Sequence, residues 1–103
     1  MKLIFAVLFL ISTSVFGYSQ DTGKVGRIYV TPAGLIAFKL VSGFPNAIET
    51  NQCVDNNGWA GHYAADPVLK SAILSAKTAG FSIIATLEGC EGRWFKVKDI
   101  YIK

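Results

Sequence analysis

The 103-residue sequence is poor in the side chains from which catalytic and metal sites are built. It has one histidine, His62, two cysteines and 17% charged residues. Two thiols and one histidine, widely separated, lack the paired ligand spacing of a zinc site. The chain has neither a glycine-rich phosphate loop nor a paired-carboxylate motif. We therefore expect no metal, no cofactor and no enzymatic activity.

The sequence also lacks an apolar run long enough to cross a membrane. Its longest candidate, Leu3 to Ile11, has about nine residues, whereas a spanning helix needs roughly 20. Lys2 precedes this run and small and polar residues follow it, which is the layout of a secretory signal peptide. The pattern predicts a signal peptide over residues 1–19, cleaved after Gly17 or Ser19, and a secreted or periplasmic single domain over residues 20–103.

A concentrated charge of one sign is absent as well. Loss of Lys2 with the signal peptide leaves nine Lys and Arg against seven Asp and Glu, a net charge of about +2. Nucleic-acid binding usually shows a concentrated basic patch. The basic residues here are scattered along the chain, which favours a solvated surface and no nucleic-acid partner: Lys24, Arg27, Lys39, Lys70, Lys77, Arg93, Lys96, Lys98 and Lys103.

The two cysteines, Cys53 and Cys90, are expected to form a disulfide. A domain of about 84 residues has a modest core and often needs a covalent staple. An exported chain enters an oxidising compartment, where a pair of thiols normally closes. A loop of about 38 residues would stabilise the fold by roughly 4 kcal/mol in the chain-entropy estimate. Metal binding and catalysis are the alternatives for these thiols.

Hydrophobic alternation predicts strands over residues 24–30 and 35–42, joined by a turn at 31–34, and further strands over 81–88 and 94–102. A short polar third strand is expected at about 47–54. Asp66 as N-cap, Pro67 at the first position and Gly80 as C-cap predict a helix over Pro67 to Ala79. This order predicts a mainly β fold with one helix, a five-stranded OB-like Greek-key barrel. The alternative is an open antiparallel α+β sheet with one packed helix.

The segment "NNGWAGHY", residues 56–63, is where a ligand is expected first. An aromatic ring beside amide side chains can contact a sugar, the ring covering a pyranose face and the amides bonding hydroxyls. Trp59 could instead plug the core, the two asparagines could be turn residues, and the histidine could lie on a surface loop. The candidate ligand-binding residues are Asn56, Asn57, Trp59, His62 and Tyr63.

A resemblance adds to this interpretation. The order of a cysteine, "NNGWAG", "DPVLKSAILSAKTAG", an apolar strand, a second cysteine and a closing "IYI" resembles small exported bacterial proteins of unassigned role. More distantly it is similar to the B subunits of pentameric AB5 toxins of the pertussis and subtilase cytotoxin type, in which a tryptophan also precedes the helix. The matching pieces here are Trp59, the helix to Ala79, Gly80 and the strand from Phe81.

The resemblance implies an OB-like barrel, a homo-oligomeric ring of five and glycan recognition on the barrel wall. The chain departs from the toxin subunits in its shorter length, its single cysteine pair and its lack of their early serine-containing sugar-binding segment. No family site residue is therefore carried across.

Two hypotheses of different class follow. The first is an exported, non-enzymatic binding module for a glycan or cell-surface partner, with an oligomeric state like that of the toxin subunits. The second is a periplasmic structural or accessory protein that binds another protein. An enzyme ranks third.

Overall fold

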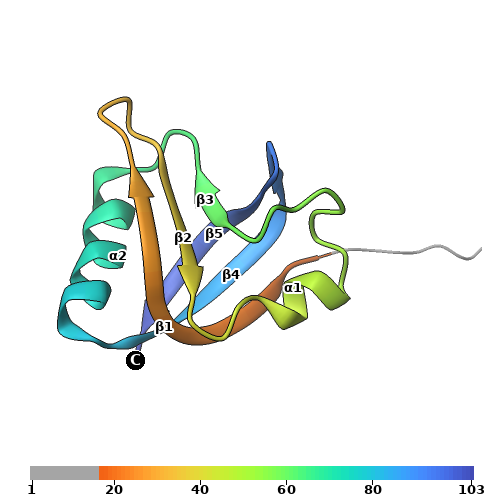
Figure 1. Ribbon diagram of the computed structural model, residues 1–103, viewed down its shortest axis with the longest axis horizontal. Helices are drawn as coiled ribbons and strands as arrows, with labels where there is room; N and C mark the ends of the chain where they lie inside the picture. The colour runs from red at the N-terminus through yellow and green to blue at the C-terminus, as the bar shows by residue number, and fades with distance from the viewer. Residues whose placement is uncertain (1–16) are drawn as a thin grey trace, which may run out of the picture.

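The computed structural model of the chain describes residues 17–103 (Figure 1). The predicted signal peptide lies outside the described residues except for its last three positions, 17–19. The elements in chain order are β1 (Ser19–Val30), β2 (Ile36–Leu40), α1 (Pro45–Glu49), β3 (Ala60–His62), α2 (Pro67–Ala79), β4 (Ser82–Glu91) and β5 (Trp94–Ile102).

The five strands close into a barrel in the order β1-β2-β3-β5-β4. Neighbouring strands are antiparallel except for β3 and β5, which pair in parallel over two positions. The fold is mainly β, and α2 connects β3 to β4 along one side of the barrel (Figure 1). This strand order with the helix after the third strand confirms the predicted OB-like barrel. The open-sheet alternative is wrong.

Alternate residues of β5 are buried at its start, as the period of two requires, whereas Ile36, Ala37 and Phe38 of β2 are buried consecutively. The largest fully buried side chains are Phe38, Phe95, Ile36, Ile73, Ile83 and Leu87. The ring of Phe44 lies edge-on between Phe38 and Phe95, with ring centroids 6.1 and 5.7 Å away. Edge-to-face aromatic packing of this kind adds to the stability gained from area burial alone.

Helix α2 begins and ends where the sequence predicts. The Asp66 side chain accepts a hydrogen bond from the backbone N–H of Val68, and Pro67 occupies the first turn. Gly80 ends the helix in the left-handed conformation, with φ of 74°. Ile73 and Ala76 are its buried residues. Ala79, the last residue of the helix, is exposed.

The predicted third strand at 47–54 is wrong. Residues Pro45–Glu49 form the short helix α1, and the third strand is Ala60–His62. The cause is Asp21 of β1, a buried side chain whose two carboxylate oxygens accept hydrogen bonds from the backbone N–H groups of Asn46 and Ala47. These N–H groups belong to the first helical turn, where no intrahelical acceptor exists. A second helix therefore accompanies the one that was expected.

The predicted disulfide is present. Cys53 and Cys90 are bonded with their Cα atoms 5.0 Å apart, and the bond joins the loop after α1 to β4. Next to it, the backbone N–H of Gly89 donates to the Gln52 side chain. Within residues 17–103, none of the helices has the length and apolar character needed to span a bilayer.

Candidate functional site

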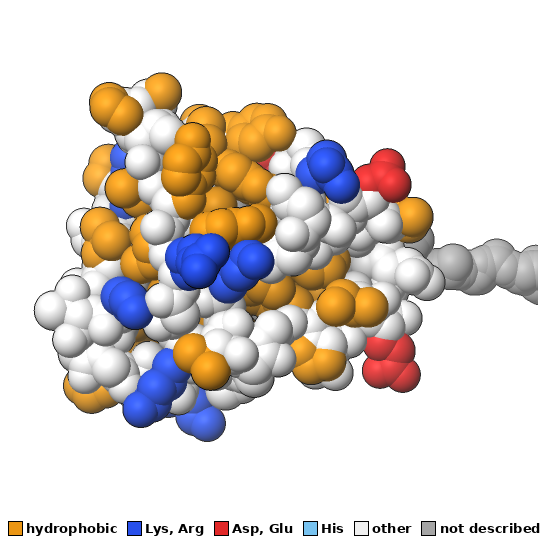
Figure 2. Space-filling view, in the orientation of Figure 1, with side chains coloured by type: hydrophobic (Ala, Val, Ile, Leu, Met, Phe, Trp, Pro, Cys, Tyr) orange, Lys and Arg blue, Asp and Glu red, His pale blue; other side chains and the backbone are white. Residues whose placement is uncertain are grey.

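The outer surface of β1, β2 and β3 carries the most distinctive group of side chains in the described part of the chain. Strand register brings its residues together: Arg27 pairs with Lys39, Tyr29 with Ala37, and Ala37 in turn with Gly61 of β3. Residues two apart on a strand share a face. Figure 2 views the molecule from this side, and basic side chains lie at its middle with hydrophobic side chains gathered above them.

Four aromatic side chains form what we call the aromatic face: Tyr29 of β1, Trp94 of β5, Trp59 in the loop before β3 and Tyr63 in the turn after it. The ring centroid of Trp94 lies 6.5 Å from that of Tyr29 and 5.3 Å from that of Tyr63, both edge-on. Both tyrosines remain about half exposed, at 49% and 46%. Large aromatic side chains that pack on each other yet stay in contact with solvent leave ring surface free for a ligand.

Two glycines make room for these rings. A Cβ atom on Gly61 would lie 2.7 Å from Cε3 of the Trp94 indole, so the ring rests on bare backbone of β3. A Cβ atom on Gly92 would collide with the phenol of Tyr63. The chain thus has no side chain at the two positions over which the rings lie. Their orientation is fixed by backbone, and the face is preorganised.

Basic groups border the aromatic face. The ammonium of Lys39 lies 5.1 Å from the ring centroid of Trp59, a cation–π contact. Arg27 is exposed directly across the β1–β2 ladder from Lys39. Within residues 17–103 the ion pairs are Lys96 with Glu91 and Lys98 with Glu88, so neither Arg27 nor Lys39 has a carboxylate partner there.

The side chains of the two asparagines predicted to bind a ligand, Asn56 and Asn57, form hydrogen bonds with the protein backbone. The Asn56 amide donates to the carbonyls of Trp59 and Arg93, at 2.8 and 3.0 Å, and its oxygen accepts from the backbone N–H of Gly58. The Asn57 side chain accepts from the backbone N–H of Trp59. These bonds hold Trp59 in place. The asparagines support the aromatic face from behind, as turn residues do.

Trp59 and Tyr63 are the predicted residues that the structure brings into the aromatic face. Trp59 is half-buried and lies outside the buried core cluster, where the aromatic rings are those of Phe38, Phe44 and Phe95. It therefore does not plug the core. Tyr63 is exposed, and its backbone N–H donates to Glu91.

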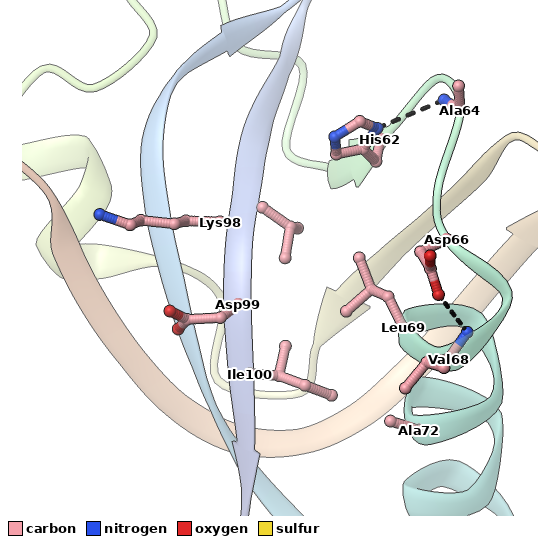
Figure 3. Close-up of a pocket in the computed structure, with 10 residues that line it drawn as sticks. His62, Ala64, Asp66, Val68, Leu69, Ala72, Lys98, Asp99 and Ile100 are labelled. Carbon is pink, nitrogen blue, oxygen red and sulfur yellow. Dashed lines mark hydrogen bonds between the residues drawn. The ribbon is translucent and has the colours of Figure 1, made fainter.

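His62 lies apart from the aromatic face. It lines a groove of about 520 Å³ between β5 and α2, whose apolar walls include Leu69 and Ile100 (Figure 3). Its Nδ1 accepts from the backbone N–H of Ala64, and the figure shows Asp66 turned toward the helix, where it caps α2. Among residues 17–103, this bond to Ala64 is the hydrogen bond that the His62 side chain makes, and its partner is a backbone group.

Sequence reasoning missed Tyr29 and Trp94 as site residues, together with Arg27 and Lys39. The alternation in residues 24–30 does place Arg27 and Tyr29 on one strand face, and that in residues 35–42 places Lys39 on the solvent side of its strand. The strand pairing was the missing information.

Comparisons with protein-family models, curated proteins and solved structures find no match to this chain. Among residues 17–103, no group of three or more His, Cys, Asp and Glu side chains is placed to hold a metal ion.

Proposed function

We propose that this chain is an exported, non-enzymatic binding module that recognises a saccharide with its aromatic face. The observation that carries the proposal is the gathering of Tyr29, Trp59, Tyr63 and Trp94 on one outer wall of the barrel. This wall includes the β2–β3 surface, which OB-folds commonly use to bind oligosaccharides and oligonucleotides.

The chemistry of the face suits a sugar. Aromatic rings offer flat apolar surface to the C–H groups of a pyranose, while the two tyrosine hydroxyls can donate to and accept from sugar hydroxyls. The rings are held by glycines and by the Asn56 loop, so little side-chain entropy is lost when a ligand binds. The sequence resemblance to AB5 toxin B subunits carries the same expectation of glycan recognition on the barrel wall.

Export is part of the proposal and rests on the sequence of residues 1–19 and on the disulfide. Cys53 and Cys90 form a disulfide. Disulfides persist in oxidising compartments and are rare in cytosolic proteins. A secreted or periplasmic chain of this kind meets polysaccharides and glycan-bearing cell surfaces. The rings and hydroxyls of the aromatic face would bind a saccharide without reacting with it.

A glycan array with matched variants tests this function. We expect the wild-type chain to bind a defined set of glycans and the variants Tyr29→Ala and Trp59→Ala to weaken that binding by about tenfold, the loss of one stacking contact. Tyr101→Ala is the control, because Tyr101 is a tyrosine of similar exposure, 56%, outside the aromatic face. A blank array, or equal losses in all three variants, would contradict the proposal.

A second candidate function is binding of another protein, including further copies of this chain. The observation that favours it is exposed apolar surface on α2 and at the sheet end beside it, where Val68 is 76%, Phe81 52% and Ile102 45% exposed. Apolar surface of this kind often marks an interface. Light scattering on the purified chain and a pull-down from native envelopes test this candidate: a defined oligomer or a recovered partner supports it, and a strict monomer that recovers no partner counts against it.

A further inference from the structure

We propose that the aromatic face is selective for acidic saccharides, and that Arg27 and Lys39 together bind the carboxylate or sulfate group of the sugar. This inference rests on the proposed function, because it names the class of saccharide that the same face would take.

The first observation is the juxtaposition of two cations. Arg27 and Lys39 are Cα partners in the β1–β2 ladder, and both stand on the outer side of the barrel. Cα atoms that face each other across antiparallel strands are about 4.5–5.5 Å apart. Like charges in directly opposite positions destabilise a sheet. The pair thus costs stability in the free protein, and a bound anion between the two groups would remove that cost.

The second observation is that the described residues offer no internal anion to this pair. The carboxylates that form ion pairs within residues 17–103 are Glu91 and Glu88, and their partners are Lys96 and Lys98. The Lys39 ammonium instead lies over the Trp59 ring. Within residues 17–103, the Lys and Arg side chains that donate hydrogen bonds are those of Lys77 and Arg93, so the Arg27 guanidinium has no hydrogen-bond partner there. A guanidinium can bind a carboxylate or sulfate through two parallel hydrogen bonds, and an ammonium adds a point charge.

The third observation is the position of the cations relative to the rings. Arg27 is two residues before Tyr29 on β1, and Lys39 is in contact with Trp59. A sugar ring lying on either aromatic side chain would place an acidic substituent within reach of both cations. A single acidic sugar unit could therefore stack on an aromatic ring and bind the two cations at the same time.

The same charges argue for a saccharide over a single-stranded nucleic acid. A strand of nucleic acid repeats a phosphate at each nucleotide, and its binding sites track that backbone with a continuous basic groove. Lys96 of β5, whose Cα pairs with that of Gly61, is already paired with Glu91 at 3.9 Å. Arg27 and Lys39 thus form a local pair of cations that suits a single anionic group.

Isothermal titration calorimetry with four defined probes tests the inference: a hyaluronan oligosaccharide with uronic acids, a sulfated heparin oligosaccharide, a neutral laminarin oligosaccharide of the same length, and oligo-dT. We expect the two acidic saccharides to bind about tenfold more tightly than the neutral one at low salt, the contribution of one charge-assisted hydrogen bond. This preference should fall when ionic strength is raised to about 0.2 M, because exposed charges are then screened.

Charge variants assign the effect to the pair. Arg27→Gln and Lys39→Gln should each weaken acidic binding by about tenfold, so that each variant loses most of the preference for acidic over neutral saccharides. Lys24→Gln is the control, because Lys24 is an exposed cation on the same strand that pairs with Ser82 of β4, outside the aromatic face. Arg27→Lys should recover part of the lost affinity.

The possible results separate this inference from the proposed function. Equal affinity for neutral and acidic saccharides, with loss on Trp59→Ala, would overturn the acidic selectivity and leave saccharide binding standing. Failure of all three saccharides would overturn both. Tighter binding of oligo-dT than of either acidic saccharide would overturn both in favour of nucleic-acid binding.

Discussion

Replacing Gly61 with alanine should damage both the barrel and the aromatic face. A Cβ atom at this buried position would lie 2.9 Å from the Ala37 Cα and 2.7 Å from the Trp94 ring, and closer still to the Ile36 carbonyl oxygen. Real Cβ atoms keep at least 3.0 Å from such atoms, so the indole has to move by about 0.3 Å and the β2 backbone, at the Ile36 carbonyl, by more than that.

The magnitude follows from what must move. Two of the three atoms belong to the backbone of β2, which is held by β1 on one side and β3 on the other. Overpacking a rigid site by one methyl group typically costs about 1–3 kcal/mol. A loss of about 2 kcal/mol would lower the melting temperature of a domain of this size by about 8–16 °C. The displaced Trp94 ring should also weaken saccharide binding.

Thermal and urea unfolding followed by circular dichroism measure this effect. The control is Gly26→Ala, since a Cβ atom at Gly26 would meet its nearest neighbour, Cγ2 of Val41, at an ordinary distance of 3.4 Å. We expect this control to change the free energy of unfolding by less than about 0.5 kcal/mol. If Gly61→Ala unfolds like the wild type and binds the same glycans, Gly61 does not hold Trp94 as described.

Three further predictions concern stability. Replacing Cys53 and Cys90 with serine, or reducing the disulfide, should lower the free energy of unfolding in urea by about 4 kcal/mol. A loss below about 1 kcal/mol would show that the loop between the two cysteines is already constrained without the disulfide. Asp66→Ala should lower the free energy of unfolding by about 1 kcal/mol. Asp66→Ser should be nearly neutral, because a serine hydroxyl oxygen can accept the hydrogen bond from the Val68 N–H as the aspartate oxygen does. Asp21→Ala should cost about 2 kcal/mol by leaving the first N–H groups of α1 without acceptors, and protection of those amides from hydrogen exchange that survives the substitution would contradict this role.

Local signals were sufficient for the elements that could be predicted. Asp66 and Gly80 mark the two ends of α2 through bonds and dihedral angles that involve only nearby residues. Apolar and polar residues alternate within each of the segments that form β1, β2, β4 and β5. The order of these strands and the helix along the chain predicted the barrel that the structure shows. The disulfide followed from the compartment that residues 1–19 predict.

The elements that were missed depend on distant partners. Helix α1 starts where Asp21, 25 residues earlier in the chain, accepts its first N–H groups. Strand β3 has three residues, one of them Gly61, and shows no period of its own. It exists because Ile36, Ala37 and Phe38 of β2 pair with it on one side and Phe95 and Lys96 of β5 on the other.

The candidate site was found in part for the same reason. The segment 56–63 contributes Trp59 and Tyr63, and the aromatic ring of Trp59 beside two asparagines pointed to it. The remaining members, Tyr29 and Trp94, come from strands far apart in the sequence and meet only in the closed barrel. Their contact needs the strand order and the bare Gly61 between them, neither of which a single segment reveals.

The most direct test of the central claim is the location of saccharide binding, measured by NMR titration of the ¹⁵N-labelled chain with an array hit. The account predicts shift changes at the backbone amides of Tyr29 and Gly61 and at the indole N–H groups of Trp59 and Trp94. Changes confined to the groove between α2 and β5, around Leu69 and Ile100, would contradict it.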